Sequence, residues 1–199
     1  AVLCEEAPSD GTPYVRVADC RKGLAYVSRE FFGDPAKEMT LIGITGTSGK
    51  TTSSYLIKHM LEMKLDAKVG LIGTNGNMIG SECLHSDHTT PESYELHKLF
   101  RRMADEGCTH VVMEVSSHAL ALERVAGIEY DVGVYTNLSQ DHLDLHGTME
   151  EYAAAKRLLF RQCKLGCLNA DDKWTDFMLN GATCKAMTFS AESDSADLT

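Results

Sequence analysis

The heptapeptide Gly-Thr-Ser-Gly-Lys-Thr-Thr, which starts at Gly46, holds the groups that a phosphate-binding loop needs. Gly46 and Gly49 allow positive φ angles and close approach of the backbone to a ligand. The Lys50 ammonium can reach terminal phosphates, and the hydroxyl of Thr51 or Thr52 can bind Mg²⁺. The alternative is a glycine-rich turn that only leads into a helix.

The surroundings of this heptapeptide favour phosphate binding. The run 41–44 is short and β-branched, which is typical of a buried strand. From Lys50 to Leu61, apolar residues recur near helical spacing. A helix that begins directly after such a loop points its free amide groups and the positive end of its dipole at an anion. Ile44 stands where the common pattern G-x-x-x-x-G-K-[ST] has its first glycine, so the match to that pattern is incomplete.

A second group of reactive side chains follows the apolar run 109–115. Glu114 lies near the end of this run, where a carboxylate is costly to bury without a partner. It is suited either to bind Mg²⁺ opposite the glycine-rich loop or to form a salt bridge at the sheet edge. Ser116 can contact a ligand or cap the following helix. Arg124 can bind a carboxylate or phosphate by two parallel hydrogen bonds, as arginine often does, or it can be a surface cation.

The third group lies in the segment 137–147. Within six residues it carries two carboxylates and two imidazoles, those of Asp141, His142, Asp144 and His146. This mixture suits Mg²⁺ or Mn²⁺ beside a nucleotide about as well as it suits zinc. A polar loop that caps a helix at Thr148 would explain the capping residues but not the histidines. We therefore expect His142 to serve a metal or a nucleotide.

Lys156 closes the segment Tyr-Ala-Ala-Ala-Lys within a predicted helix. The three alanines leave space beside the lysine. On composition alone, however, a lysine of this kind is a solvated surface residue, and the residues themselves assign it no chemistry.

Alternating strands and helices must position these groups. From residue 40 onward the predicted strands are 40–45, 67–73, 109–115, 131–136, 166–169 and 184–189. The predicted helices between them are 50–64, 91–106, 148–162 and 171–179. This alternation predicts an α/β fold, a mainly parallel sheet with helices on both faces and a P-loop-like mononucleotide site. Ligands bind beyond the carboxyl ends of such strands, so the three groups should meet at one edge.

Composition excludes several partners. The chain has 199 residues and a formal net charge of −10. Nucleic-acid and anionic-membrane surfaces need clustered Lys and Arg, so neither partner is expected. No stretch approaches the roughly 18 continuous apolar residues of a membrane span. The seven cysteines are scattered, which is typical of a reduced cytoplasmic protein.

Residues 1–38 differ from the rest of the chain. They offer one candidate strand and one candidate helix, and two elements cannot bury a core alone. We expect them to be the end of a preceding domain and its linker. The last predicted strand closes shortly before residue 199, so we expect the domain 39–199 to be incomplete.

Five segments, in this order and spacing, resemble the motifs of the Mur ligases. They are TGTSGKTT, HTTPES, MEVSSHAL followed by Arg124, TNLSQDHLDLHG, and YAAAK. The resemblance runs from about residue 12 to about residue 190. Within the family it is greatest to the members that add a diamino acid to UDP-MurNAc-L-Ala-D-Glu. Ser48 stands where asparagine is commoner in the family.

The resemblance implies an ATP-dependent amide-bond ligase of cytoplasmic peptidoglycan precursor synthesis, acting as a monomer. ATP would phosphorylate the D-glutamate carboxylate of UDP-MurNAc-L-Ala-D-Glu. The amine of meso-diaminopimelate or L-lysine would then attack the acyl phosphate. It also implies a UDP-binding domain that ends near residue 38, an ATP-binding central domain in 39–199, and a C-terminal amino-acid-binding domain that is absent here. We therefore expect no ligase activity from these 199 residues alone.

The resemblance also implies roles for single residues. The ATP phosphates would be held by Gly46, Thr47, Ser48, Gly49, Lys50, Thr51 and Thr52, with Asn137 on the nucleotide side. The Mg²⁺ ligands would be Thr51, Glu114, His142 and Lys156, the last as a carbamate. The UDP-MurNAc-dipeptide would contact Thr89, Thr90, Ser116 and Arg124. The catalytic residues would be Lys50, Glu114, His142 and Lys156. Leu122 stands where many relatives have glutamine, so that polar contact is missing.

Three other functions share part of this pattern. Another Mur-type ligase would have the same ATP-binding motifs. A non-catalytic nucleotide-binding module would need the glycine-rich loop but not Lys156. A zinc hydrolase built on the segment DHLDLH would leave the glycine-rich loop unexplained.

Overall fold

The protein is described by a computed structural model that covers residues 1–141 and 143–199. Its strands are β1 (Val2–Cys4), β2 (Tyr14–Arg16), β3 (Thr40–Thr45), β4 (Val69–Gly73), β5 (Gly76–Ile79), β6 (Glu82–Leu84), β7 (His110–Glu114), β8 (Tyr130–Tyr135), β9 (Cys163–Asn169) and β10 (Lys185–Phe189). Its helices are α1 (Cys20–Phe31), α2 (Lys50–Leu65), α3 (Ser93–Asp105), α4 (Ser117–Ala121), α5 (Leu143–His146), α6 (Met149–Arg157) and α7 (Thr175–Leu179), with the 3₁₀ turns η1 (Pro35–Glu38) and η2 (Leu158–Arg161).

The main sheet has eight strands in the order β10-β9-β8-β3-β7-β4-β5-β6. Neighbours from β10 to β4 are parallel, whereas β4, β5 and β6 pair antiparallel. The predicted mainly parallel sheet is therefore confirmed. The chain leaves β3 for β4 on one side and later adds β8 on the other side of β3. This reversal of direction creates the crevice at which α/β sheets bind ligands.

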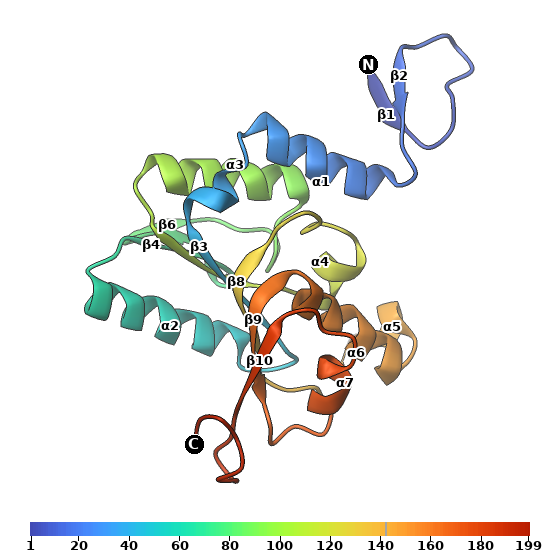
Figure 1. Ribbon diagram of the computed structural model, residues 1–199. Coiled ribbons are helices and arrows are strands. Elements are labelled where there is room, and N and C mark those ends of the chain that lie inside the picture. Colours follow the sequence, from blue (N-terminus) through green and yellow to red (C-terminus); the bar gives the residue numbers. More distant parts are fainter. Residues whose placement is uncertain (142) are drawn as a thin grey trace.

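Helices cover both faces of the sheet, as the sequence predicted (Figure 1). Because successive side chains of a strand point to opposite faces, β3 contributes to two cores. Leu41 belongs to a large core with Phe100 of α3, and α4 and α6 pack on the same side. Ile44 belongs to a smaller core with Ile57 of α2 on the other side. A strand buried on both faces reads as a continuous apolar run, which is why β3 was recognisable.

No strand or helix was predicted between residues 73 and 91, yet the structure has two strands there. They form the hairpin β5–β6, which extends the sheet antiparallel to β4. Gly73 pairs with Gly76 across a turn of two residues, and Gly76 has a positive φ of 113°. Antiparallel strands need only such a short connection, whereas parallel strands need a crossover.

Helix and strand boundaries after residue 148 also need correction. The predicted helix 148–162 ends as an α-helix at Arg157 and continues as the 3₁₀ turn η2. β9 begins at Cys163, three residues earlier than predicted from the apolar pattern. The start was predicted correctly, because Thr148 and Glu151 form the expected capping box.

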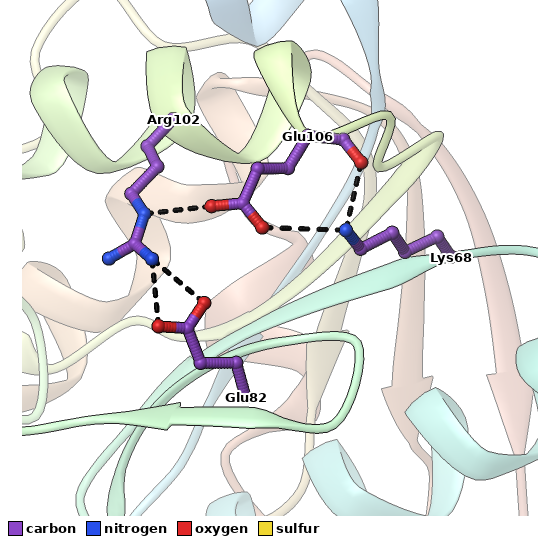
Figure 2. A network of polar contacts seen from close by, with 4 residues as sticks. All are labelled: Lys68, Glu82, Arg102 and Glu106. Carbon is purple, nitrogen blue, oxygen red and sulfur yellow. Dashed lines mark hydrogen bonds and ion pairs between the residues drawn. The ribbon is translucent and has the colours of Figure 1, made fainter.

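An ionic network fixes the hairpin to α3 and to the start of β4 (Figure 2). Arg102 Nη2 contacts both Glu82 carboxylate oxygens at 2.8 and 2.7 Å, and Arg102 Nε donates to Glu106 at 2.8 Å. Lys68 Nζ donates to the Glu106 carbonyl oxygen at 2.8 Å. These side chains are partly exposed, so solvent screens the pairs and they add little stability, and their main effect is to fix where the hairpin lies.

Residues 1–38 form the expected strand and helix with one addition. β1 and β2 pair as a separate two-stranded parallel sheet, and α1 packs against α3. The rings of Phe32 and Tyr94 lie 5.3 Å apart, and Arg29 donates to the Gly127 carbonyl oxygen at 3.3 Å. Within the described part of the chain, no helix is long and apolar enough to cross a bilayer.

Candidate functional site

The glycine-rich loop lies between the end of β3 and the start of α2, as predicted. Gly46 has a φ of 151° and Gly49 a φ of 85°, which are conformations that favour glycine. A Cβ at Gly46 would also collide with the Thr136 hydroxyl. Gly49 is the N-cap residue of α2, and no described side chain caps this helix. The first amide groups of α2 therefore remain free to bind an anion.

The loop is shaped by the segment that follows β8. Ser48 N donates to Asn137 Oδ1 at 3.0 Å, and Asn137 Nδ2 donates to the Ser48 carbonyl oxygen at 3.1 Å. Thr47 N donates to the Asn137 carbonyl oxygen at 2.9 Å. Thr136 Oγ1 donates to the Ser48 carbonyl oxygen at 2.8 Å. The observed contacts of Asn137 hold the loop, and its contact with a nucleotide stays a prediction.

Two lysines converge on the carbonyl oxygen of Gly46. Lys50 Nζ donates to it at 2.9 Å and to the Thr47 carbonyl oxygen at 2.9 Å. Lys156 Nζ donates to the Gly46 oxygen at 2.8 Å and lies 4.5 Å from the centre of the Tyr152 ring. Lys156 is only 1% exposed. The interpretation of Lys156 as a solvated surface lysine is therefore wrong, because α6 directs this side chain to the loop.

This environment makes the Lys156 ammonium unusually acidic. Burial, and to a lesser extent the neighbouring Lys50 charge, lower the pKa of Lys156 to about 7 against the opposing charge of Asp141. Burial also lowers the pKa of Lys50, against the opposing charges of Glu114 and Asp141. Near neutral pH a large share of Lys156 is therefore a neutral amine, the form that reacts as a nucleophile.

The shifted pKa predicts how stability depends on pH. In the unfolded chain Lys156 has its ordinary pKa of 10.5, so between pH 7 and 10.5 the unfolded state binds more protons. Stability should rise with pH across this window. Below pH 7 the buried ammonium destabilises the folded state by its full amount. Lys156→Met should therefore raise the free energy of unfolding by about 1 to 3 kcal/mol near pH 6. The gain should shrink towards about pH 10.

Urea unfolding of wild type and Lys156→Met at both pH values measures this effect. Lys164→Met is the matched control, because Lys164 is exposed and paired with Asp131 at 2.8 Å. A change that is equal at the two pH values would contradict the buried-ammonium explanation.

Glu114 lies opposite the loop, at the end of β7, and is fully buried. Thr51 Oγ1, in the first turn of α2, donates to Glu114 Oε2 at 3.0 Å. Thr74 donates to the same carboxylate twice, from its backbone N–H to Oε1 at 3.0 Å and from its hydroxyl to Oε2 at 3.1 Å. Hydrogen bonds, rather than the salt bridge considered from the sequence, satisfy this carboxylate within the described residues.

The donor set fits Mg²⁺. Thr51 Oγ1 and Glu114 Oε2 are hard oxygen atoms at the N-terminal end of α2, and Mg²⁺ prefers few protein oxygens together with phosphate oxygens. Among residues 1–141 and 143–199, no group of three or more His, Cys, Asp or Glu side chains is placed to hold a metal, as a zinc site would require. His142, an expected ligand, lies outside the described residues.

The predicted substrate contacts lie beside Glu114. Thr90 Oγ1 donates to the Glu114 carbonyl oxygen at 2.9 Å, and Ser116 N donates to Thr90 Oγ1 at 3.1 Å. Arg124 Nη1 donates to the Thr90 carbonyl oxygen at 3.1 Å, and Arg124 Nη2 pairs with Glu92 at 2.7 Å. Ser116 also caps α4, which confirms one interpretation of this serine, and its contact with the substrate stays a prediction.

Arg124 has a donor left over in this arrangement. Its Nε is buried without a partner in the described part of the chain. A buried donor of this kind costs free energy unless a ligand satisfies it.

Residue-level reasoning missed two members of this site. Thr74 contacts Glu114 as described above, and its hydroxyl lies 3.0 Å from the Thr89 hydroxyl. The Tyr152 hydroxyl lies 3.2 Å from Thr47 Oγ1. The signal for Thr74 was its position directly after the predicted strand 67–73, where the sheet rule places ligand contacts.

The family model and the curated relatives agree on one family. The family described as Mur ligase middle domain matches residues 44–199. The UDP-N-acetylmuramoyl-L-alanyl-D-glutamate--2,6-diaminopimelate ligase of Caldanaerobacter subterraneus subsp. tengcongensis is 48% identical over 180 residues, which is 90% of this chain and 37% of the relative. The enzyme of the same name from Corynebacterium glutamicum is 57% identical over 149 residues, 75% of this chain and 29% of the relative. The chain thus spans well under half of these curated relatives.

Solved structures agree with the sequence relatives. A UDP-N-acetylmuramoyl-L-alanyl-D-glutamate--2,6-diaminopimelate ligase superposes with a TM-score of 0.87 at 32% identity, covering 99% of this chain and 41% of that one. The MurF ligase of Thermotoga maritima, solved in complex with ADP, has the same fold with a TM-score of 0.56 at 20% identity, covering 97% of this chain and 42% of that one. Motifs, fold and relatives thus lead to one conclusion: the chain belongs to the Mur ligase family, whose middle domain its residues 44–199 match.

Proposed function

We propose that the chain is the ATP-binding part of a ligase that joins 2,6-diaminopimelate to the D-glutamate of UDP-MurNAc-L-Ala-D-Glu. The observation that carries this proposal is the meeting of Lys50, Glu114 and Lys156 around one glycine-rich loop. The names of the relatives at 48% and 57% identity support the choice of substrates.

In this proposal the loop holds the phosphates of ATP. The backbone from Gly46 to Thr52 supplies amide groups, and the Lys50 ammonium leaves its loop carbonyls to neutralise the β- and γ-phosphate oxygens. The ADP in the Thermotoga maritima neighbour supports a nucleotide ligand for this fold. Asn137 fixes the loop in the binding conformation through Ser48.

Mg²⁺ would be held by Thr51, Glu114, His142 and a carbamate on Lys156, and it would neutralise charge on the phosphates when bound. Formation of the carbamate joins the neutral amine of Lys156 to CO₂ and releases a proton. Burial of this amine beside Gly46 supports the assignment, since it keeps a reactive neutral fraction near pH 7.

The acceptor substrate would lie against Thr89, Thr90, Ser116 and Arg124. Arg124 would orient the substrate carboxylate by parallel hydrogen bonds, to which its unpartnered Nε can contribute. The D-glutamate carboxylate oxygen attacks the γ-phosphorus of ATP, and ADP leaves. The amine of diaminopimelate then attacks the carbonyl carbon of the acyl phosphate, loses a proton, and expels inorganic phosphate as the amide forms.

The remaining proposals concern context. Residues 39–199 would be the ATP-binding domain, and residues 1–38, with their separate sheet β1–β2, would belong to the UDP-binding domain and its linker. The protein would act in the cytoplasm as a monomer, without a nucleic-acid or membrane partner.

Phosphate release by the full-length protein tests the function. ATP and Mg²⁺ are supplied with diaminopimelate and, in separate reactions, UDP-MurNAc-L-Ala-D-Glu or the precursor of another Mur ligase. We expect release only with UDP-MurNAc-L-Ala-D-Glu, together with the tripeptide product in a mass spectrum. Release with another precursor would assign a different Mur reaction. Nucleotide binding without release in any reaction would indicate a non-catalytic module.

A further inference from the structure

Thr74 connects the two halves of the site. It follows β4 directly and donates to both carboxylate oxygens of Glu114, at 3.0 and 3.1 Å. Its hydroxyl lies 3.0 Å from the Thr89 hydroxyl. Thr74 therefore contacts both the carboxylate assigned to Mg²⁺ and a threonine assigned to the acceptor.

The end of β4 is shaped to receive the Glu114 carboxylate. A Cβ at Gly73 would collide with Glu114 Oε1, so glycine leaves the space that the carboxylate fills. Glu114 is fully buried, and its two oxygens accept from Thr51 and Thr74. A buried carboxylate with three donors has one fixed orientation, because rotation would break charge-assisted hydrogen bonds.

The donors and acceptors also fix the direction of the two hydrogen bonds that link Thr89, Thr74 and Glu114. Thr74 has a single hydroxyl proton, and it points to Glu114 Oε2. The hydroxyl pair of Thr74 and Thr89 must then be formed by the proton of Thr89. A ligand that moves Thr89 therefore changes the hydrogen bond that the Thr74 hydroxyl accepts from Thr89. Through Thr74 it also changes the hydrogen bonding of Glu114.

We propose that Thr74 is a positioning residue that couples nucleotide binding at Glu114 to acceptor binding at Thr89. This inference rests on the proposed function, since it requires both ligands. We expect this coupling to be positive, and linkage then requires that the acceptor and the Mg²⁺-bound nucleotide raise the affinity of the protein for each other by the same factor.

Calorimetry on the full-length protein tests the coupling. The Kd of a non-hydrolysable ATP analogue is measured at several Mg²⁺ concentrations, with and without UDP-MurNAc-L-Ala-D-Glu. We expect Thr74→Val to raise the Kd roughly tenfold in the presence of Mg²⁺, because it removes one hydrogen bond to a charged group. It should also abolish the effect of the acceptor on that Kd. Thr74→Ser keeps the hydroxyl, so it should retain both the wild-type Kd and the effect of the acceptor on that Kd.

Matched controls separate this role from general destabilisation. Thr109→Val makes the same substitution near the other end of β7, where the threonine hydroxyl contacts only its neighbour His110 among the described residues. Thr109→Val should leave the Kd of the analogue, and the effect of the acceptor on that Kd, at the wild-type level. If Thr74→Val does not fold, Thr89→Val decides, because it removes the same link from the acceptor side.

The outcomes distinguish the two proposals. Wild-type coupling in Thr74→Val, or in Thr89→Val where Thr74→Val does not fold, would overturn the role of Thr74 while leaving the ligase proposal intact. Absence of Mg²⁺-dependent analogue binding in the wild-type protein would instead overturn the proposed function.

Discussion

Lys156→Ala is expected to lower the rate of ATP-dependent amide formation by roughly three orders of magnitude in the full-length protein. The lysine is buried against Gly46, where its carbamate would place a carboxylate beside the phosphates. Alanine leaves a cavity of suitable shape, so formate or acetate in the buffer should restore part of the rate. Phosphate release with and without these acids measures both effects.

Lys164→Ala is the control for this experiment, because it removes an exposed lysine paired with Asp131. It should leave the rate unchanged, and short acids should have no effect on it. Full activity of Lys156→Ala would contradict the carbamate role. Lys156→Met should lose activity while it gains stability near neutral pH, which is the expected relation for a buried functional charge.

Lys50→Met is expected to weaken binding of the ATP analogue and to reduce turnover by roughly a hundredfold or more. The Lys50 ammonium is held at the loop by the carbonyl oxygens of Gly46 and Thr47, close to where the terminal phosphates would lie. Its point charge would be lost with no replacement in the described part of the loop. Calorimetric titration of the analogue and a phosphate-release assay measure the two effects.

Lys64→Met makes the same substitution on the last turn of α2, where the side chain is exposed. It should bind the analogue as the wild type does. Thermal unfolding of Lys50→Met is also needed, since two loop carbonyls lose a donor. Unchanged analogue affinity in a folded Lys50→Met protein would exclude this loop as the phosphate site.

The sheet edge was predictable because its elements obey simple rules. β3 is apolar on both faces, α2 follows a glycine-rich loop, and Glu114 ends a third apolar run. Parallel strands place their carboxyl ends at one edge, so the proximity of Thr51 and Glu114 followed from the order of elements. The contribution of His142 stays a prediction.

The burial of Lys156 was not predicted, although the sequence carries a signal for it. Tyr152, Ala153, Leu159 and Phe160 are all buried and recur on one face of the helix and its 3₁₀ continuation. Lys156 lies on the same face, three to four residues from its apolar neighbours. A lysine in the middle of an apolar stripe indicates a functional environment, whereas the residue type alone predicts a solvent-exposed side chain.

The hairpin β5–β6 was missed for a different reason. Its strands have only four and three residues, too few for a periodic pattern to stand out from a polar loop. Its place depends on contacts distant in sequence, such as the pair of Arg102 with Glu82. Thr74, which lies at the base of this hairpin, was missed with it.

Transfer of oxygen-18 tests the central claim most directly. UDP-MurNAc-L-Ala-D-Glu labelled in the reacting glutamate carboxylate is incubated with the full-length protein, ATP, Mg²⁺ and diaminopimelate, and the released phosphate is analysed by mass spectrometry. An acyl phosphate at the loop of Lys50 predicts one labelled oxygen in each phosphate released, and release of labelled phosphate that is roughly a hundredfold slower with Lys50→Met. Release of unlabelled phosphate together with amide product would contradict it.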